Sequence, residues 1–270
     1  MPYALITGAS KGIGKAFAES LAKRKIDLLL VARTELLLKQ LAGDLKKQYG
    51  IQVQYLAIDL SLHDSPQNIS RWIEENKFEV QILINNAGYG LWGNFSDLNL
   101  QEQNEMITVN ISTMINLTYL MIPKMRTQKQ AYILNVSSTA AYQAVPTLTL
   151  YAAAKAFVLS FSRALRYELK DSPISVSCIS PGPTKTNFVD RARMLHMQKL
   201  SDKMSMSAET VAEAGINGML RKKAEIIPGL TNRMSVMAAR FTPKTLVEKV
   251  AAGLYTKKEK HQANGISKAK

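Results

Sequence analysis

Residues 2–24, PYALITGASKGIGKAFAESLAKR, join a short apolar run to a glycine-rich turn and an amphipathic helical stretch. Gly8, Gly12 and Gly14 leave the backbone free to turn tightly and to approach a ligand closely. The helix that follows offers its N-terminal amides and the positive end of its dipole to a phosphate. The glycine spacing differs from the G-x-G-x-x-G pattern, and a plain connecting turn is the alternative. Its place between the first strand and the first helix nevertheless predicts a dinucleotide-binding turn.

Strand-like and helix-like stretches alternate along the rest of the chain. Apolar runs of strand length are separated by stretches of helical periodicity, the pattern of a parallel sheet with helices on its faces. We therefore predict an α/β fold with a doubly wound parallel sheet. The later strands are expected at 27–32, 51–58, 81–84, 131–136, 174–180 and within 225–229, and helices are expected to begin near residues 34, 64, 101, 151 and 208.

Length and composition fit one globular domain. At 270 residues and 46% hydrophobic, the chain can bury a large core, and α/β folds of this size are often single domains. We expect one domain over residues 1–255, with a substrate lid at 187–225 and a C-terminal helical segment at 230–255. Residues 256–270 form a basic tail that we expect to be disordered.

Cysteine content, apolar runs and charge each disfavour a class of protein. The single cysteine, Cys178, excludes a disulfide framework or a cysteine metal cluster, and its apolar surroundings predict a buried side chain. No uninterrupted apolar run reaches the ~20 residues of a membrane span, and no charged leader precedes the first strand, so we expect a cytoplasmic location. The net charge of +14 suits anionic partners. The basic residues are scattered without interleaved aromatics, which disfavours nucleic acid.

A second stretch, NVSSTAAYQAVPTLTLYAAAK at residues 135–155, carries the candidate chemistry. Tyr151 and Lys155 are spaced i,i+4 and share one face of a helix, so the ammonium group would stabilise a phenolate and lower the tyrosine pKa. A tyrosine with a lowered pKa can act as a general acid or base. Ser138 follows the apolar strand run, where its hydroxyl could hold a carbonyl oxygen. Ten tyrosines in a lysine-rich chain give about one Tyr-x-x-x-Lys pair by chance. The pair therefore points to a function only together with the motifs around it.

The end of the second predicted strand bears on the choice between NAD and NADP. An acidic residue there would bind the 2′-hydroxyl of NAD, but this chain has Arg33, and Lys11 lies in the glycine turn. Two cations suit a 2′-phosphate, which predicts NADP(H) as the cofactor. Asp59 ends the third strand and would either accept a hydrogen bond from the adenine amino group or cap the next turn.

Three further features lie beside the expected cofactor crevice. The polar turn Asn85–Gly88 follows the fourth strand, and Pro181–Thr186 follows the sixth. The Thr186 hydroxyl would meet the nicotinamide end, with a turn lacking any ligand as the alternative. Asn110 interrupts an apolar helical stripe. It is either a hydrogen-bonded core amide or the centre of a helix distortion that exposes a carbonyl to a water reaching Lys155.

Together these motifs resemble those of the short-chain dehydrogenase/reductase family, in the family's order and approximate spacing over about residues 3–190. The resemblance implies a Rossmann-type sheet of seven parallel strands in a three-layer α/β/α arrangement. Within the family, the chain is similar to bacterial ketoacyl and hydroxysteroid reductases. The shared motifs are TGASKGIG at Thr7–Gly14, NNAG at Asn85–Gly88, Asn110, Ser138, YAAAK at Tyr151–Lys155 and PGPTKT at Pro181–Thr186.

The resemblance also implies a set of site residues. Tyr151 would donate the proton and Ser138 would position the substrate oxygen. Lys155 would bind the nicotinamide ribose and lower the tyrosine pKa, and Asn110 would hold a water in the proton relay. We choose Ser138 over Ser137 because the family's serine lies thirteen residues before its tyrosine. The implied cofactor contacts are Gly8, Ser10, Lys11, Gly12, Ile13, Gly14, Arg33, Asp59, Leu60, Asn86, Ala87, Gly88, Tyr151, Lys155, Pro181, Gly182, Thr184 and Thr186.

The composition changes beyond residue 187. Seven of the twelve methionines lie between residues 194 and 237. Methionine fills irregular apolar space, so this region suits a mobile lid over an apolar substrate or, alternatively, loose core packing. The apolar face of the C-terminal helical segment most simply packs on the domain or on another subunit, and membrane-surface contact is not favoured. The family's usual assembly implies a homodimer or homotetramer.

These features together predict an NADPH-dependent carbonyl reductase that is reversible as an alcohol dehydrogenase. The substrate is expected to be an apolar ketone, such as a 3-oxoacyl or steroid-like compound. No metal is expected, because His63, His196 and His261 lack ligand spacing. The alternative is an NADP-binding regulatory or interaction protein without useful turnover, and an intact catalytic set argues against it.

Overall fold

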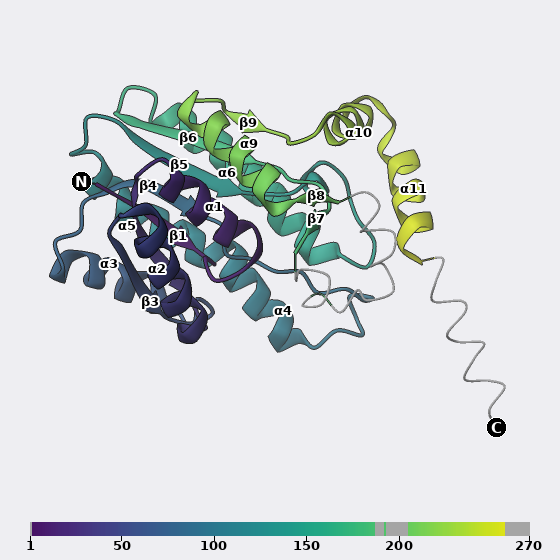
Figure 1. Cartoon of the computed structure of the whole chain (residues 1–270). Helices are drawn as coiled ribbons and strands as arrows, with labels where there is room; N and C mark the ends of the chain where they lie inside the picture. Colours follow the sequence, from purple (N-terminus) through teal and green to yellow (C-terminus); the bar gives the residue numbers. More distant parts are fainter. Residues whose placement is uncertain (1, 187–191, 193–204, 257–270) are drawn as a thin grey trace.

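The computed structural model describes residues 2–186, 192 and 205–256, which build a sheet flanked by helices (Figure 1). The sheet has seven parallel strands in the order β3-β2-β1-β4-β5-β6-β9, so the predicted Rossmann-type fold is confirmed. The strand order reverses between β1 and β4, and ligands bind at the carboxyl ends of the strands at such a point. The strands are β1 (Tyr3–Thr7), β2 (Asp27–Ala32), β3 (Val53–Ala57), β4 (Val80–Asn85), β5 (Ala131–Val136), β6 (Ile174–Ile179) and β9 (Glu225–Ile226).

Helices cover both faces of the sheet, which is why central strands such as β2 are apolar along their whole length. On one face, α1, α2 and α9 bury residues such as Phe17 and Ile216 against the strands. On the other face, α3, α5 and α6 bury Leu117 and Leu165. The helices are α1 (Gly12–Lys23), α2 (Glu35–Tyr49), α3 (Ser65–Glu75), α5 (Thr113–Met125), α6 (Thr149–Glu168) and α9 (Ala208–Leu220).

A continuous helical stretch, Leu100–Met125, lies in the second of these layers. It consists of α4 (Leu100–Ile107), a π-helical turn η1 (Thr108–Ser112) and α5. Asn99 caps it by accepting a hydrogen bond from the Glu102 amide. With a mean hydropathy of 1.3 over its most apolar window, it is long and apolar enough to cross a membrane by length and composition alone. Because it packs against α3, β4 and α6, we interpret it as a core helix of the domain.

The boundaries of two elements affect the site. Helix α6 begins at Thr149 rather than at Tyr151, so Tyr151 lies within its first turn. A short parallel pair, β7 (Thr184–Lys185) with β8 (Met206–Ser207), joins the segment after β6 to the residues before α9. Strands of two residues carry no detectable periodicity, and the sequence did not predict this pair.

Two predicted segments fall partly outside the described residues. Within the expected lid at 187–225, residues 187–191 and 193–204 are outside them, whereas α9 packs against α1 as part of the helical layer. Within the expected tail at 256–270, residues 257–270 are outside them.

The C-terminal helices, α10 (Leu230–Phe241) and α11 (Lys244–Thr256), extend from the domain beyond β9 (Figure 1). Arg240 attaches α10 to the domain through an ion pair with Glu225 at 2.8 Å and lies over the Tyr142 ring, 5.2 Å from its centroid. The Tyr142 hydroxyl donates to the same carboxylate at 2.6 Å. Burial, together with this acceptor, raises the pKa of Tyr142 above its usual value, so the phenol remains the donor.

A polar clamp joins α1 to α9. Glu213 accepts hydrogen bonds from Ser20 at 2.6 Å and from the Arg24 guanidinium at 2.7 Å. Arg24 also donates to Asn217 at 3.0 Å. The hydrogen bond from Arg24, followed by the one from Ser20, lowers the pKa of Glu213 to about 2.

We expect the stability that this clamp provides to depend on acid pH. Because the Glu213 pKa is lowered in the folded state, its contribution is present above the unfolded-state pKa of about 4.5 and is lost as pH falls toward about 2. Glu213→Gln should therefore lower the melting temperature at pH 7 and differ less from the wild type at pH 3. Thermal unfolding across this range, with the exposed Glu75→Gln as control, tests the expectation. A gap between Glu213→Gln and wild type that stays constant with pH would contradict it.

Candidate active site

The candidate site lies where the carboxyl ends of β1, β4, β5 and β6 meet. The glycine turn follows β1, the turn Asn85–Gly88 overlaps the end of β4, Ser138 follows β5 and Pro181–Thr186 follows β6. These are adjacent central strands, so motifs that are far apart in sequence are brought to one edge of the sheet. This is the edge at which doubly wound sheets bind dinucleotides.

The glycine turn is held in place by β4. Gly8 and Gly12 have φ angles of +66° and +55°, which side chains other than glycine rarely adopt. The Asn86 side-chain amide donates to the carbonyl oxygens of Thr7 and Gly8 at 2.9 and 3.2 Å. A β-carbon at Gly14 would collide with the Gly8 carbonyl and would lie 2.5 Å from the Asn86 amide nitrogen. The predicted phosphate turn therefore requires the glycines and the asparagine together.

The Tyr151–Lys155 pair lies in the first two turns of α6. Lys155 is 4% exposed, and its ammonium nitrogen lies 5.7 Å from the centroid of the Tyr151 ring. The ammonium group donates to the Val136 carbonyl at 3.0 Å. Burial lowers the Lys155 pKa to about 8, which leaves the amine mostly protonated at pH 7. A fixed, nearly dry cation therefore lies beside the only ionisable hydroxyl of the YAAAK motif.

The two adjacent serines have different partners. Ser137 is buried and its hydroxyl donates to the Lys155 backbone carbonyl at 2.7 Å, which holds α6 against the end of β5. Ser138 is half-buried and accepts a hydrogen bond from the Ala140 amide, capping the short helix η2 (Thr139–Tyr142). The Ser137 hydroxyl is thus engaged with α6, and the contact of Ser138 with a substrate oxygen stays a prediction.

Asn110 sits at the centre of the π-helical turn η1. Its side-chain amide donates to the Met106 carbonyl of the same helix at 2.8 Å and to the Tyr89 carbonyl of the loop after β4 at 2.9 Å. The structure shows a hydrogen-bonded buried amide and a helix distortion, and the water that would reach Lys155 stays a prediction. Its Oδ1 atom is buried and has no hydrogen-bond partner.

A small cavity, lined mostly by apolar side chains, lies beside Asn110 and Lys155. Its volume is about 10 Å³, and Asn85, whose Oδ1 is also buried and unpartnered, lines it as well. This size is close to the minimum needed for one water, which requires two to four polar partners. A β-carbon at Gly88 would lie 2.5 Å from Asn110 Oδ1 and 3.1 Å from Lys155 Nζ. Glycine at position 88 therefore leaves room for both polar groups beside the backbone.

Two of the residues expected to bind the adenosine end of the cofactor lie together at the carboxyl ends of β2 and β3. Arg33 and Asp59 form an ion pair at 3.6 Å, and both side chains are partly exposed. Burial alone would raise the Asp59 pKa, but hydrogen bonds from Ser61 and the Arg33 charge together lower it. Asp59 thus fills the turn-capping role that was the alternative to adenine binding. Lys11 is exposed in the glycine turn, and Leu60 is buried.

The segment after β6 closes over the glycine turn. A β-carbon at Gly12 would lie 3.1 Å from the Thr186 methyl carbon, so the two segments are in near contact. The Thr184 hydroxyl donates to the Gly182 carbonyl at 2.9 Å, and the Pro181 carbonyl accepts from the Thr139 amide. Gly182 in turn lies against Asn232 of α10.

The structure also identifies residues that the sequence reasoning missed. Asn85 donates to Asn135 at 2.8 Å and to Thr118 at 2.9 Å, and Asn135 donates to Ser162 at 2.9 Å. These buried bonds link α5 to α6 beneath the site. The sequence contained one signal for this network, because Asn135 is a polar residue near the end of the apolar strand AYILNV.

Within the described part of the chain, no three His, Cys, Asp or Glu side chains cluster as metal ligands would. His196 and His261 lie outside the described residues. Cys178 is buried on β6, and burial raises its thiol pKa to about 11, so the thiol remains protonated at neutral pH.

Comparison with known proteins identifies the family. The family model described as short chain dehydrogenase matches residues 2–195. The chain belongs to this family. The short-chain dehydrogenase assignment covers the glycine turn, the Asn110 helix and the Tyr151–Lys155 pair, and it confirms the family resemblance in the motifs.

Two curated relatives and one solved structure show which short-chain dehydrogenases are similar. Hydroxysteroid dehydrogenase-like protein 1 of Gallus gallus is 33% identical over 80% of this chain and 64% of its own length. A very-long-chain 3-oxoacyl-CoA reductase of Anas platyrhynchos is 37% identical over 66% of this chain and 58% of its own. The chain thus spans less than two thirds of these relatives. A short-chain dehydrogenase from Sphingobium yanoikuyae in complex with NADPH has a TM-score of 0.79 and 30% identity, over 89% of this chain and 93% of that one.

Proposed function

We propose that this chain is an NADPH-dependent oxidoreductase that reduces a ketone and, in reverse, oxidises the corresponding alcohol. Hydride would pass from the nicotinamide to the carbonyl carbon while Tyr151 donates a proton to the carbonyl oxygen. Ser138 would hold that oxygen by a hydrogen bond. Lys155 would stabilise the tyrosinate that remains. A water held beside Asn110 in the small cavity would take part in returning a proton to Tyr151.

The observation that carries this proposal is the buried ammonium beside Tyr151. A buried charge is costly unless it has a role or a partner, and the one hydrogen bond that the structure gives this ammonium goes to a neutral carbonyl. An ammonium in this position favours the anionic form of the neighbouring phenol, which is the form that the reduction leaves behind. A binding module without turnover would not need Tyr151 and Lys155 together.

NADPH in place of NADH is supported by the charges at the adenosine end. Arg33 and Lys11 provide two partly or fully exposed cations, and the carboxylate nearby, Asp59, is already engaged with Ser61. The similar protein from Sphingobium yanoikuyae was solved in complex with NADPH. A 2′-phosphate would compete with Asp59 for the Arg33 guanidinium.

Arg33→Ala should weaken NADPH binding by about tenfold to hundredfold, as expected for the loss of a charge-assisted hydrogen bond. NADH binding should change far less, because NADH has no 2′-phosphate. Titration of both cofactors by fluorescence measures the effect. The matched control is Arg126→Ala. Arg126 is exposed and lies between α5 and the amino end of β5, whereas the cofactor crevice is at the carboxyl ends of the strands. Equal losses for the two cofactors would contradict the assignment of Arg33.

An apolar substrate is supported by the side chains around Tyr151. One apolar cluster contains Val145, Leu148 and Ala152, with Tyr151 packed against it. A second contains Leu91 and also contacts Tyr151. Relatives named as a 3-oxoacyl-CoA reductase and a hydroxysteroid dehydrogenase-like protein favour a 3-oxoacyl thioester or a steroid-like ketone.

The deciding experiment is NADPH and NADH oxidation against a panel of 3-oxoacyl thioesters, steroid ketones, small diketones and aromatic aldehydes. Turnover that requires Tyr151 supports the proposal and ranks the substrate classes. Tight NADPH binding without turnover on any ketone would favour the non-catalytic cofactor-binding alternative. A cytoplasmic location and a homodimer or homotetramer remain part of the proposal, to be tested by fractionation and light scattering.

A further inference from the structure

Helix α10 exposes a continuous apolar face. Leu230, Met234, Met237 and Phe241 follow the spacing i, i+4, i+7 and i+11, which places them on one side of the helix. All four are exposed, and Phe241 is 81% exposed. On the opposite side, Val236 is 2% exposed and packs into the domain. Packing on the domain, one of the two arrangements expected for this face, is therefore not what the structure shows, and packing on another subunit stays a prediction.

Helix α11 also exposes apolar side chains. Leu246 and Val250 are spaced i,i+4 and are both more than half exposed, whereas Ala251 is buried. We call these six side chains the outer face: Leu230, Met234, Met237, Phe241, Leu246 and Val250. Single exposed apolar residues are ordinary, but six of them at helical spacing on two consecutive helices indicate an interaction surface.

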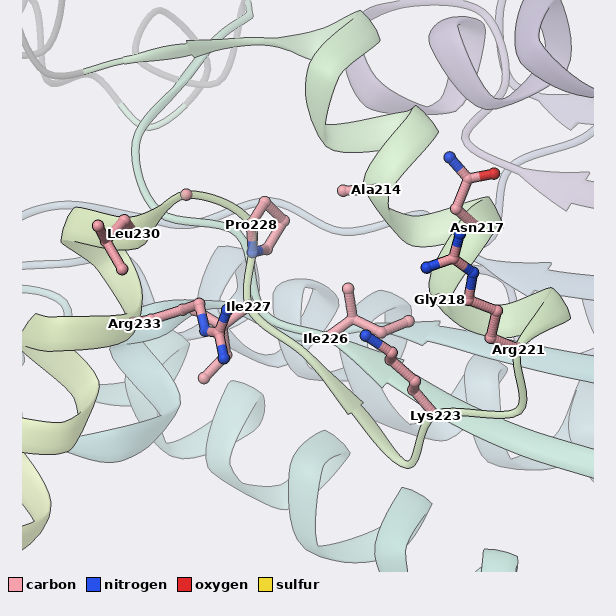
Figure 2. Close-up of a pocket in the computed structure, with 11 residues that line it drawn as sticks. Ala214, Asn217, Gly218, Arg221, Lys223, Ile226, Ile227, Pro228, Leu230 and Arg233 are labelled. Carbon is pink, nitrogen blue, oxygen red and sulfur yellow. The ribbon is translucent and has the colours of Figure 1, made fainter.

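A cationic cleft adjoins the outer face at Leu230. It has a volume of about 310 Å³ and lies between the end of α9, the segment after β9 and the start of α10. Figure 2 shows Arg221 and Lys223 on one side of the cleft and Arg233 on the other, with Leu230 beyond Pro228. Among the described residues that line the cleft there is no carboxylate, and none of them belongs to the predicted site.

The charge of this region limits what the outer face can bind. Among the described residues, 230–256 contain four lysines and arginines and one glutamate, a net charge of +3, and the cleft adds Arg221 and Lys223. A second copy of the chain meeting this face about a two-fold axis would bring like charges together. A partner that presents an apolar surface with anionic groups beside it would match both the outer face and the cations. A bilayer containing anionic lipids has this composition.

We propose that α10 and α11 dock the protein on an anionic membrane surface. The outer face enters the boundary between headgroups and acyl chains, and the cationic cleft takes a lipid phosphate through Arg221, Lys223 and Arg233. Helices of this kind lie in the plane of the interface, so the domain is held against the membrane without spanning it.

Docking would place the bilayer beside the entrance of the candidate site. Asn232 of α10 packs against Gly182, in the segment after β6, and donates to the Pro228 carbonyl at 2.8 Å. Met206 of β8 lies against Gly229, at the start of α10. The helix that faces the membrane is thus in contact with the segment expected at the nicotinamide end. The docking itself does not depend on the proposed reduction, since none of the residues that make it lies in the catalytic set.

Vesicle flotation tests the docking. The full chain is mixed with vesicles of phosphatidylcholine alone and with vesicles of an equimolar mixture of phosphatidylcholine and phosphatidylglycerol. We expect binding to the anionic vesicles, little binding to the neutral ones, and release by salt. The double variant Met234→Ser/Phe241→Ser should weaken binding by at least about tenfold. Arg221→Gln/Lys223→Gln should weaken it by about fivefold for each cation removed.

Matched controls separate docking from general effects of charge and hydrophobicity. Leu36→Ser/Leu62→Ser removes two exposed apolar side chains elsewhere, and Lys46→Gln/Lys47→Gln removes two cations from α2. Both should bind vesicles like the wild type, and thermal unfolding should confirm that every variant is folded. Failure of the wild type to bind anionic vesicles, or equal loss in variants and controls, would overturn the proposal. So would a wild-type dimer that Met234→Ser/Phe241→Ser converts to a monomer, because the outer face would then be a subunit interface.

Discussion

Tyr151→Phe should lower the rate of ketone reduction by about a hundredfold to ten-thousandfold, the range that general acid catalysis contributes. The substitution removes only the hydroxyl, and the ring keeps its packing against the two apolar clusters around it. NADPH affinity should be largely retained, because Lys155 and the glycine turn are unchanged. Steady-state kinetics together with a cofactor titration measure both quantities.

The control for this substitution lies on the same helix. Tyr167→Phe removes the hydroxyl of a tyrosine that is 71% exposed, four turns further along α6, and should leave turnover unchanged. Turnover that persists in Tyr151→Phe would remove the tyrosine from the proposed mechanism. Loss of both turnover and NADPH binding would instead indicate a structural role for the hydroxyl.

Gly14→Ala should abolish measurable cofactor binding and destabilise the fold by about 1–3 kcal/mol or more, the usual range for overpacking. The added β-carbon would collide with the Gly8 carbonyl and approach the Asn86 amide, both of which form the turn itself. The Gly8 carbonyl is a backbone group and cannot move aside as a flexible side chain could, so the turn must shift. The hydrogen bonds that Asn86 donates to Thr7 and Gly8 would then be lost.

Gly43→Ala is the matched control for this prediction. A β-carbon at Gly43 meets no atom within 4 Å, and the residue lies inside α2. Alanine has the higher helix propensity, so this substitution should stabilise the protein by about 0.5–1 kcal/mol and leave NADPH binding intact. Thermal unfolding and NADPH titration of the two variants provide the comparison. A Gly14→Ala protein that binds NADPH normally would contradict the proposed phosphate turn.

The fold was predictable because its signals are local. The apolar run of β1, the glycine turn and the amphipathic α1 lie within 22 residues of one another, and the alternation continues through β6. Strands buried on both faces are apolar along their length, as in β2, so they stand out in the sequence. The short pair β7 and β8 has no such signal, since two residues cannot show periodicity.

The candidate site was predictable in its residue types but not in its contacts. The i,i+4 spacing placed Tyr151 and Lys155 on one face of a helix, and the structure has them there. The hydrogen bond from the Ser137 hydroxyl to the Lys155 carbonyl depends on how the end of β5 packs against α6. Likewise, the pairing of Arg33 with Asp59 depends on the neighbouring positions of β2 and β3 in the sheet.

The sequence by itself determined the order of strands and helices, the glycine turn and the chemistry available at the strand ends, because backbone conformation and helical or strand periodicity are set by residues close together in the chain. Only the tertiary structure decided which of those groups meet, how deeply Lys155 is buried, and that the apolar face of α10 and α11 points away from the domain. A helical pattern shows that one face is apolar, but it contains no information on what covers that face, since the covering surface comes from distant parts of the chain or from another molecule.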